Sequence, residues 1–433
     1  MRTPVDRAIL VGTPGDTERA EDAREHLAEL GRLTDTAGGV IVGRLVQRRR
    51  SPGPRYYLGR GKAAELSELV REHDANLIIF DDELTPAQGK NLEELCGVRV
   101  MDRAELILDI FATRARTHEA RMQVELAQLQ YLLPRLRRMW IHLSRIRGGI
   151  GLRGPGETQL ETDRRLIGTR IAELRRKLRG VARAEAVRRK RREGSFRAAL
   201  VGYTNAGKSS LLQALSGAKQ RVEDRLFATL DASTRIVDVG DGHEVLVTDT
   251  VGFIRKLPHH LIASFRSTLE EAAEADVLLH VIDASHPHMD GQRRVVRDVL
   301  EELDLRRRPR IVVFNKIDLL GSDDLLALRK RFNGPDSRCA LFASAVTPAT
   351  LEPLRGELRA RIRARMQTVD VEMPAAEGKT LAALYHEGEV LSRSQDGCMV
   401  RVVANAPPAL IGRLRSTHGV RVKARQSHGG FPQ

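Results

Sequence analysis

Cysteine and aromatic residues are scarce in this chain of 433 residues. The three cysteines, Cys96, Cys339 and Cys398, lie far apart and form no C-x-x-C pair, so they indicate small core residues or unreactive thiols in a reducing compartment. Aromatic residues make up 4% of the chain, which argues against base stacking as the main mode of contact with a nucleic acid.

Long apolar runs are also missing. No stretch of about 18 apolar residues occurs, so we expect no transmembrane helix. The first residues, MRTPVDRAILVG, lack the charged start, apolar stretch and cleavage site of a signal peptide. We therefore expect a cytoplasmic protein. Its 41% hydrophobic and 30% charged residues are typical of soluble domains, and its length allows two to four of them.

Acidic residues are outnumbered by basic ones. The chain has 57 Asp and Glu against 72 Lys and Arg, which gives a net charge of +15. Such a chain is attracted to polyanions, either RNA or an acidic membrane surface. A solvated basic surface without a partner explains the total charge almost as well, so the positions of the basic residues have to decide.

Residues 1–115 alternate between strand-like and helix-like segments. Four apolar runs predict strands, at residues 8–11, 40–46, 77–80 and 98–101. Four longer segments predict helices, at residues 17–30, 62–73, 85–95 and 104–114. This order predicts a small parallel sheet with helices packed on it. The glycine-rich turn at 56–62 could bind an anion, but a structural turn is the favoured interpretation.

Two heptad patterns follow, in residues 116–195. Apolar residues recur every three or four positions, first through 122–140 and then through 160–181. Such stripes are typical of helices that pair along a seam, so we expect an antiparallel helical hairpin. Residues 158–161 fit a capping box at the start of the second helix, and Pro134 is expected to kink or split the first.

The turn of this hairpin is rich in glycine and arginine. Residues 147–157 hold five glycines and two arginines. Glycine lets a backbone approach a ligand closely, and arginine binds phosphate through paired hydrogen bonds. A plain turn needs only a few residues, so we favour a binding tip over an unstructured turn. The predicted tip residues are Arg147, Gly148, Gly149, Gly151, Arg153, Gly154 and Gly156.

The second helix of the hairpin becomes strongly basic towards its end. Basic residues gather at 175–179 and 188–192, with few acidic residues between them. A solvated helix face usually mixes both signs, so this run indicates a surface that contacts phosphates through backbone and shape. A linker without a partner is the alternative.

The strongest motif begins at residue 202. A strand-like segment, 196–201, leads into GYTNAGKS at 202–209 and then into a helix-like segment. This is the phosphate-binding G-x-x-x-x-G-K-S motif in the strand-to-helix context that it requires. Its backbone N–H groups would hold the phosphates, Lys208 would reach the β- and γ-phosphates, and Ser209 would bind Mg²⁺.

Two further segments are expected to complete a magnesium and γ-phosphate site. A strand at 245–249 ends in the sequence D-T-V-G. Asp249 would hold Mg²⁺ through water, and the Gly252 N–H would meet the γ-phosphate. A threonine in a mobile loop before this strand is also needed, and we prefer Thr229 to Thr234 and Thr250.

A third group of motifs specifies the base. A strand at 311–314 leads into N-K-I-D, which resembles the guanine-specificity motif of GTPases. The Asp318 carboxylate can accept both the N1–H and the N2–H of guanine, a donor pair that adenine lacks. Asn315 would brace the loop, the stem of Lys316 would pack on the base, and a backbone N–H at 344–345 would contact the guanine carbonyl.

Together these segments predict a GTP-hydrolysing enzyme in which Lys208, Thr229 and Gly252 are catalytic. Mg²⁺ is its expected cofactor, held by Ser209 and Thr229 and by Asp249 through water. The residues predicted to bind GTP are Gly202, Tyr203, Thr204, Asn205, Ala206, Gly207, Lys208, Ser209, Phe227, Ala228, Thr229, Leu230, Asp231, Asp249, Thr250, Val251, Gly252, Asn315, Lys316, Ile317, Asp318, Ser344, Ala345 and Val346.

One position departs from the Ras-like pattern. Phe253 follows D-T-V-G where Ras-like proteins carry the glutamine that orients the attacking water. An apolar side chain cannot orient water. We therefore expect slow hydrolysis by the chain alone, until a partner or another residue completes the site.

The expected fold class is α/β. A P-loop GTPase domain with a mostly parallel sheet occupies 196–368. An N-terminal α/β domain (1–115) and the helical hairpin (116–195) precede it, and a small α+β domain (369–433) follows. Elements of that last domain are predicted at 371–374, 381–389, 398–403 and 420–422.

Several segments resemble the HflX GTPases of the Obg-like, translation-factor-related group. The resemblance lies in GGIGLRGPGETQLE at 148–161 with residues 163–165, QVELAQL at 123–129, LFATLD at 226–231 and DTVGFI at 249–254. It extends over nearly the whole chain. Leu152 stands where the family often has threonine, a harmless difference.

The resemblance implies that the chain binds the large ribosomal subunit with its rRNA and the 70S ribosome. It implies that the protein splits or rescues stalled or idle ribosomes under stress, with the hairpin directed to the peptidyl-transferase region. The family's N-terminal domain has also been linked to ATP binding and RNA unwinding, but no second nucleotide motif precedes Arg116.

Two alternatives to a ribosome-directed GTPase stay open. One is a GTPase that assists tRNA modification, although Cys398 lacks the terminal position and the activating base of such enzymes. The other is a non-enzymatic, GTP-dependent regulator at a membrane, although the narrow heptad stripe suits a helix partner better than lipid. We expect a monomer that contacts no DNA, with peripheral membrane association as an alternative.

Overall fold

The computed structural model describes residues 5–16, 18–49, 51–139, 155–190, 195–218, 226–257, 271–332 and 340–425. The chain divides into two compact units. The first contains Met1–Arg183, Val222–Asp231 and Val251–Leu269. The second contains Ala184–Arg221, Ala232–Thr250 and Glu270–Gln433.

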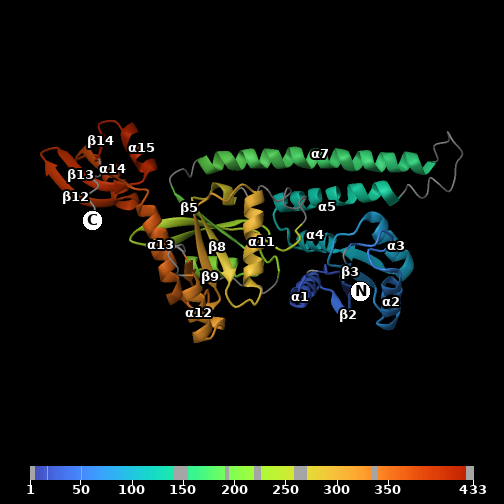
Figure 1. The fold of residues 1–433 in the computed structure, drawn as a ribbon. Helices are drawn as coiled ribbons and strands as arrows, with labels where there is room; N and C mark the ends of the chain where they lie inside the picture. The colour runs from blue at the N-terminus through green and yellow to red at the C-terminus, as the bar shows by residue number, and fades with distance from the viewer. Residues whose placement is uncertain are drawn as a thin grey trace. The chain divides into compact units, whose positions relative to one another are not determined.

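The first unit contains a parallel sheet of four strands with the spatial order β2-β1-β3-β4 (Figure 1). The strands are β1 (Arg7–Gly12), β2 (Val40–Val46), β3 (Leu77–Phe80) and β4 (Arg99–Asp102). Each is followed by a helix, in turn α1 (Ala20–Ala37), α2 (Arg60–Glu72), α3 (Pro86–Cys96) and α4 (Arg103–Arg114). The inner strand β3 is buried at every position, as expected for a parallel sheet covered by helices.

Helices α3 and α4 begin with side-chain caps, at Thr85 and Asp102. Thr85 accepts a hydrogen bond from the Gln88 N–H in a capping box, with Pro86 at the first helical position of α3. Helix α1 differs most from its prediction, which placed it at 17–30. It continues to Ala37 because the residue that ends it is Gly38, whose φ of 90° suits a left-handed cap.

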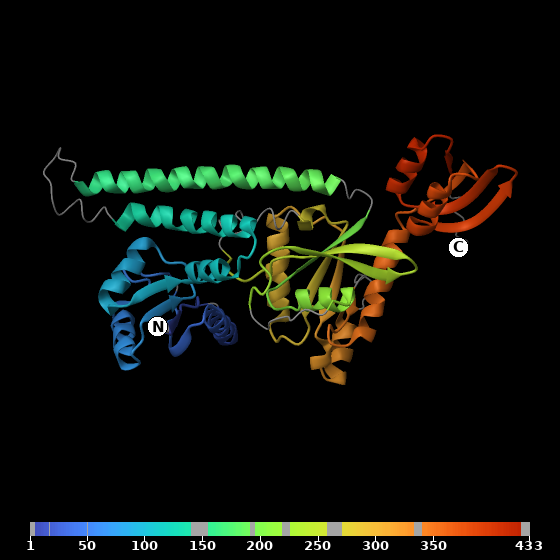
Figure 2. The ribbon, with the colours of Figure 1, turned by 180° about the vertical axis from the view of Figure 1, so that it is seen from behind.

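Two long helices complete the first unit, α5 (His118–Met139) and α7 (Pro155–Lys190), and they run side by side in Figures 1 and 2. Their predicted stripes meet in one apolar cluster, which includes Met122, Leu126, Ile171 and Leu174. The Arg170 guanidinium donates to both carboxylate oxygens of Glu125, at 2.7 and 3.0 Å.

The hairpin tests two details of the prediction. Pro134 lies inside α5 and does not divide it, so of the two predicted effects the split is excluded and the kink stays a prediction. Helix α7 begins at Pro155, so the predicted start at a capping box on residues 158–161 was wrong. A proline suits the first helical position because its missing N–H has no partner there in any case. Gly156 of the predicted tip is therefore helical, and the tip residues from Arg147 to Gly154 lie outside the described residues.

The second unit contains a six-stranded sheet with the order β10-β9-β8-β5-β7-β6. Its strands are β5 (Phe196–Gly202), β6 (Ser233–Gly240), β7 (His243–Asp249), β8 (Val277–Asp283), β9 (Arg310–Asn315) and β10 (Ala340–Phe342). All pairs are parallel except β6 with β7. Helices α8 (Lys208–Ser216), α11 (Met289–Glu302), α12 (Ser322–Phe332) and α13 (Glu352–Arg363) accompany the sheet, with short 3₁₀ turns at Ile317–Leu319 and Pro348–Leu351.

The last part of the second unit is an antiparallel sheet with the order β12-β13-β11-β14. Its elements are β11 (Gln367–Pro374), α14 (Gly378–Glu387), β12 (Glu389–Asp396), β13 (Met399–Ala406), α15 (Pro408–Ser416) and β14 (Arg421–Ala424). This succession is the β-α-β-β-α-β pattern of ferredoxin-like domains. The prediction missed β12 and α15.

The fold is thus α/β, with a P-loop GTPase domain, an α/β domain before it and an antiparallel α+β part after it. Among the described residues, no helix combines the length and apolar character that crossing a membrane requires. The four-part division at residues 115, 195 and 368 stays a prediction.

Candidate functional site

The phosphate-binding loop joins the end of β5 to the start of α8. It begins at Gly202, where an added Cβ would lie 2.3 Å from the Val281 carbonyl oxygen of the neighbouring strand. It ends at Gly207, which has a φ of 87° and whose added Cβ would lie 2.2 Å from Nδ2 of Asn315. Both positions therefore require glycine, for lack of space and, at Gly207, for backbone conformation as well.

The lysine of this loop is buried and turned back on the loop. The Lys208 ammonium donates to the carbonyl oxygens of Gly202 and Tyr203, at 3.2 and 2.9 Å. Burial lowers the pKa of Lys208 to about 8, although Asp249 acts in the opposite direction. An anionic phosphate at this point would stabilise the charged ammonium and raise the pKa again.

This pKa predicts how nucleotide affinity depends on pH. The free protein loses the Lys208 proton near pH 8, while the phosphate-bound protein retains it, so binding takes up protons above that pH. Affinity for GDP should fall about fourfold between pH 7 and pH 8.5, as follows from a pKa near 8 in the free protein. Titration calorimetry in buffers of different ionisation enthalpy measures the uptake of protons on GDP binding directly.

The control ligand is guanosine, which lacks phosphates and should bind without taking up protons. Equal proton uptake with GDP and guanosine would refute the role of Lys208 at the phosphates.

A magnesium site fits the residues beside this lysine. The Ser209 hydroxyl donates to Oδ2 of Asp249, at 2.6 Å, so the two predicted Mg²⁺ residues already lie together at the ends of α8 and β7. Hydroxyl and carboxylate oxygens are hard ligands of the kind that Mg²⁺ prefers. Asp249 is buried, which keeps its carboxylate in a fixed position.

The base-specificity residues form one connected group with the phosphate loop. The Asn315 amide donates to the Ala206 carbonyl at 3.0 Å, and its oxygen accepts the Ala345 N–H at 3.2 Å. Asn315 thus links its own loop to the phosphate loop and to the loop at Ala345, and its role at the base stays a prediction. The Ser344 hydroxyl donates to Oδ1 of Asp318 and so restrains that carboxylate, whose predicted role is to accept hydrogen bonds from guanine.

Several predicted nucleotide residues belong to the first unit, among them Thr229, Gly252 and Phe253. Their roles at the nucleotide stay predictions. The two competing threonines have structural bonds. The Thr250 hydroxyl donates to the Leu200 carbonyl at 2.7 Å, and the Thr234 hydroxyl lies 2.8 Å from that of Thr248 between two strands. Thr229 stays the predicted magnesium residue.

The segment that contains Thr229 packs within the first unit. The Phe227 ring meets the Phe111 ring edge-on, with centroids 4.7 Å apart, and is buried. Asp231 accepts hydrogen bonds from the backbone N–H groups of Arg116 and Thr117 and from the Thr117 hydroxyl. Both side chains thus have structural contacts, and the predicted contacts of this segment with GTP stay predictions.

The segment after D-T-V-G also has contacts in the first unit. Phe253 is buried, so it cannot reach a water molecule in solvent. Lys256 donates to Oδ2 of Asp81 at 2.8 Å and also pairs with Asp82. Arg255 lies 3.3 Å from the same Asp81 oxygen.

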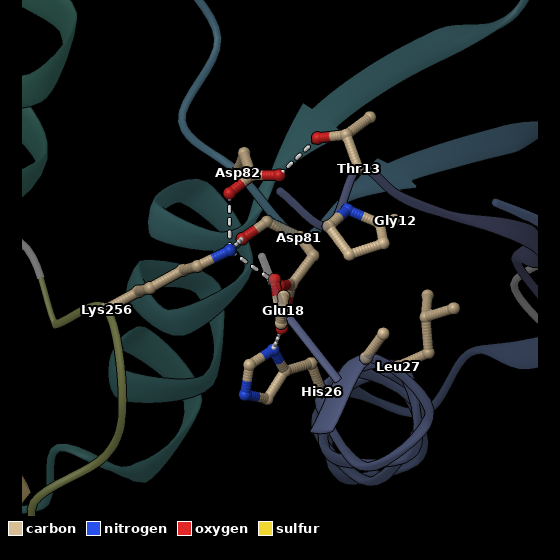
Figure 3. Close-up of a pocket in the computed structure, with 10 residues that line it drawn as sticks. Gly12, Thr13, Glu18, His26, Leu27, Asp81, Asp82 and Lys256 are labelled. Atoms are coloured by element: carbon tan, nitrogen blue, oxygen red, sulfur yellow. Dashed lines mark hydrogen bonds and ion pairs between the residues drawn. The ribbon is translucent and has the colours of Figure 1, made fainter. Parts of the chain in front are cut away.

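A small pocket surrounds this lysine at the carboxyl ends of β1 and β3 (Figure 3). The connection after β1 leads to its neighbour β2 on one side, and the connection after β3 leads to β4 on the other side. In open α/β sheets, ligands usually bind at the carboxyl ends of two such strands. Here the Thr13 hydroxyl donates to Asp82, at 2.5 Å, and Lys256 pairs with both Asp82 and Asp81. Since the ammonium already neutralises the carboxylates, we assign no ligand to the pocket.

A buried arginine lies next to this pocket and was missed by the sequence analysis. Arg103 is 2% exposed and donates to Asp81 at 2.7 Å, to Glu29, and to the Arg255 carbonyl at 3.1 Å. Burial alone would raise the pKa of Asp81, but Arg103, Arg255 and Lys256 outweigh it and lower that pKa. No local motif announces this cluster, because its members come from distant parts of the chain.

Family models match three consecutive parts of the chain. A model described as "GTP-binding GTPase N-terminal" matches residues 24–112, and one described as "GTP-binding GTPase Middle Region" matches 114–192. A third, described as "50S ribosome-binding GTPase", matches 197–316, which contains the phosphate loop and the start of the base-specificity motif.

Curated relatives match over most of the chain. A protein named GTPase HflX from Magnetococcus marinus is 42% identical, with 97% of this chain and 98% of the relative covered. The protein of the same name from Escherichia coli (strain K12) is 44% identical, with 83% of this chain and 84% of the relative covered. The one from Lacrimispora saccharolytica is 52% identical, with 72% of this chain and 74% of the relative covered. A solved GTP-binding protein of Sulfolobus solfataricus with GDP has a TM-score of 0.42 at 23% identity, covering 82% of this chain and 99% of that one, a likeness too low to carry an argument.

Proposed function

The chain belongs to the HflX family of GTPases, and on this premise we propose that it binds the large ribosomal subunit and the 70S ribosome and splits stalled or idle ribosomes under stress. That it is a GTPase follows from the family and from the P-loop domain. The ribosomal partner is supported by the description of the family model for residues 197–316.

The observation that carries this proposal is an exposed basic face on α7. The hairpin helix carries exposed arginines without an ion pair among the described residues, namely Arg164, Arg165, Arg175, Arg176, Arg179 and Arg183. Two other basic residues of the helix, Arg170 and Lys177, pair with Glu125 and Glu173. A helix with six exposed arginines that have no ion pair among the described residues is suited to a partner that supplies phosphates, such as rRNA.

The nucleotide would control binding and release in this scheme. Binding of the GTP state to the ribosome can supply the work of splitting, and hydrolysis then lowers the affinity and releases the protein. Phe253 cannot orient the attacking water, so turnover by the chain alone is expected to be slow. A group supplied by the ribosome would complete the site.

The test is GTP turnover by the purified chain, alone and with purified large ribosomal subunits. We expect strong stimulation by the subunit. A triple variant, Arg175→Gln, Arg176→Gln and Arg179→Gln, should keep the basal rate and lose most of the stimulation. Its subunit affinity should also depend less on salt, with a slope of log K against log[salt] smaller by about 2, as for three lost phosphate contacts.

A matched control replaces three exposed arginines that do have carboxylate partners. Arg32, Arg99 and Arg413 pair with Glu25, Glu105 and Glu387, so changing them to glutamine should leave stimulation unchanged. If both triple variants lose the same amount of stimulation, the net charge of the protein and not the basic face of α7 determines its response to the subunit. No stimulation of the unmodified chain would move the partner to tRNA or to a membrane.

A further inference from the structure

An acidic residue that no nucleotide motif includes lies at the base-specificity loop. Asp283 is the last residue of β8, and its register partner in the adjacent parallel strand is Asn315. The next residue of that strand's loop, Lys316, extends back to it: the ammonium lies 2.6 Å from Oδ2 of Asp283. The two residues are 33 positions apart in the chain.

The Asp283 carboxylate is held firmly. Its other oxygen accepts the Ser285 N–H at 3.0 Å and the Ser285 hydroxyl at 2.6 Å. The side chain is 11% exposed, against 26% for Lys316. A carboxylate with three donors and little solvent makes a fixed anchor, so the lysine that it binds has little freedom left.

The anchored lysine passes the phosphate loop. Its Cε lies 3.9 Å from the point where Gly207 would carry a Cβ, so the stem runs along the end of that loop. The backbone of Lys316 is left-handed, with a φ of 62°, a conformation that costs energy for a residue other than glycine. Backbone and side chain are thus both constrained to hold the four-carbon stem in one place.

We infer that Asp283 is a positioning residue for guanine nucleotides, which fixes Lys316 so that its stem forms one wall of the base site. This inference rests on the predicted guanine site at Asn315–Asp318. The Asp283 side chain binds Lys316 and Ser285, and neither belongs to the phosphate loop or to the predicted magnesium site. It acts on the bound base alone, in the same way before and after hydrolysis.

The test replaces Asp283 with asparagine, which keeps the size and the acceptor for Ser285 but removes the charge that holds Lys316. The dissociation constants of GDP and GTP should rise together, by about tenfold, as for the loss of a hydrogen bond to a charged group. Since the interaction is the same in ground state and transition state, KM should rise while kcat at saturation stays unchanged. Equilibrium titration with fluorescent GDP and GTP, and steady-state turnover, measure the two effects.

A double-mutant cycle separates positioning from a general structural role. If Asp283 acts through Lys316, the change Asp283→Asn should weaken GDP binding in the normal chain but have no further effect in a Lys316→Met chain. Additive losses in the cycle would overturn the inference. The control is Asp290→Asn, an acidic residue of the same domain that pairs with Arg293 and Arg331, and it should leave the affinity unchanged.

Failure of this inference can be told from failure of the guanine assignment. The variant Asp318→Asn tests the assignment independently, by its preference for xanthine over guanine nucleotides. If that preference appears while Asp283→Asn leaves GDP affinity unchanged, the inference about Asp283 is wrong and the guanine site stands. If neither variant changes nucleotide binding, the base site lies elsewhere and both ideas fall.

Discussion

The Asp318→Asn protein should bind xanthine nucleotides in place of GTP. A carboxylate at 318 accepts two hydrogen bonds, which matches the N1–H and N2–H donors of guanine. An asparagine amide accepts one bond and donates another, which matches the N1–H and the C2 carbonyl of xanthine. Because a site built on hydrogen bonds discriminates strongly against a mismatched ligand, GTP affinity should fall about a thousandfold.

The structure makes this a sharp test, because the rest of the site stays in place. Ser344 donates to Oδ1 of residue 318, and an asparagine oxygen can still accept that bond. Asp323→Asn, an exposed acidic residue in the first turn of α12, is the matched control and should change neither GTP nor XTP binding. Competition titrations with GDP and XDP give the ratio. Retained selectivity for guanine would show that Asp318 does not read the base.

Strands were predictable where the sequence contains an uninterrupted run of apolar residues. Strand β3 lies at the predicted residues 77–80, because these residues are an apolar run with polar residues on both sides. Strand β12 was missed because its sequence, EVLSRSQD, is polar and mostly exposed. It is a strand because it pairs with β13, and pairing with a distant segment leaves no pattern in the strand's own residues.

In the candidate site, too, residues in local motifs were predictable and residues that depend on distant partners were not. The phosphate loop and the base-specificity residues were found from the sequence because each lies on a few consecutive residues with fixed spacing. Asp283 was not found, since it reaches Lys316 across 33 positions, and only adjacent strands bring them together. Arg103 was not found either, because its partners Glu29 and Asp81 lie 74 and 22 positions away.

The second large effect is expected from Arg103→Met, which should strongly destabilise the N-terminal sheet. Arg103 is buried between Asp81 and Glu29, whose side chains are 5% and 7% exposed. Removing the arginine takes one counter-ion from Glu29 and one from Asp81, which keeps its contacts with Lys256 and Arg255. Loss of a buried charge partner typically costs about 3–5 kcal/mol. The control Arg99→Met breaks exposed pairs with Glu105 and Asp109 and should cost about 1 kcal/mol or less.

Hydrogen exchange of peptides from β3 and α4 is the suitable measurement, because it reports local opening in a chain of several domains. The loss of stability caused by Arg103→Met should become smaller as the pH falls. In the unmodified chain the pKa of Asp81 is lowered, so its contribution to stability is present above the unfolded pKa and disappears as the pH falls through the folded value. The variant lacks part of that contribution. The difference in stability between the variant and the unmodified chain should therefore become smaller at acidic pH.

A combined variant shows whether charge or packing is responsible for the Arg103→Met effect. Adding Glu29→Gln and Asp81→Asn removes the carboxylates that Arg103 neutralises, and a buried polar group without charge costs much less than an unpaired ion. We therefore expect the triple variant to recover most of the lost protection in β3 and α4. No recovery would overturn the charge explanation, and the double variant Glu29→Gln with Asp81→Asn in the presence of Arg103 would measure what the loss of the Asp81 pairs with Arg255 and Lys256 costs by itself.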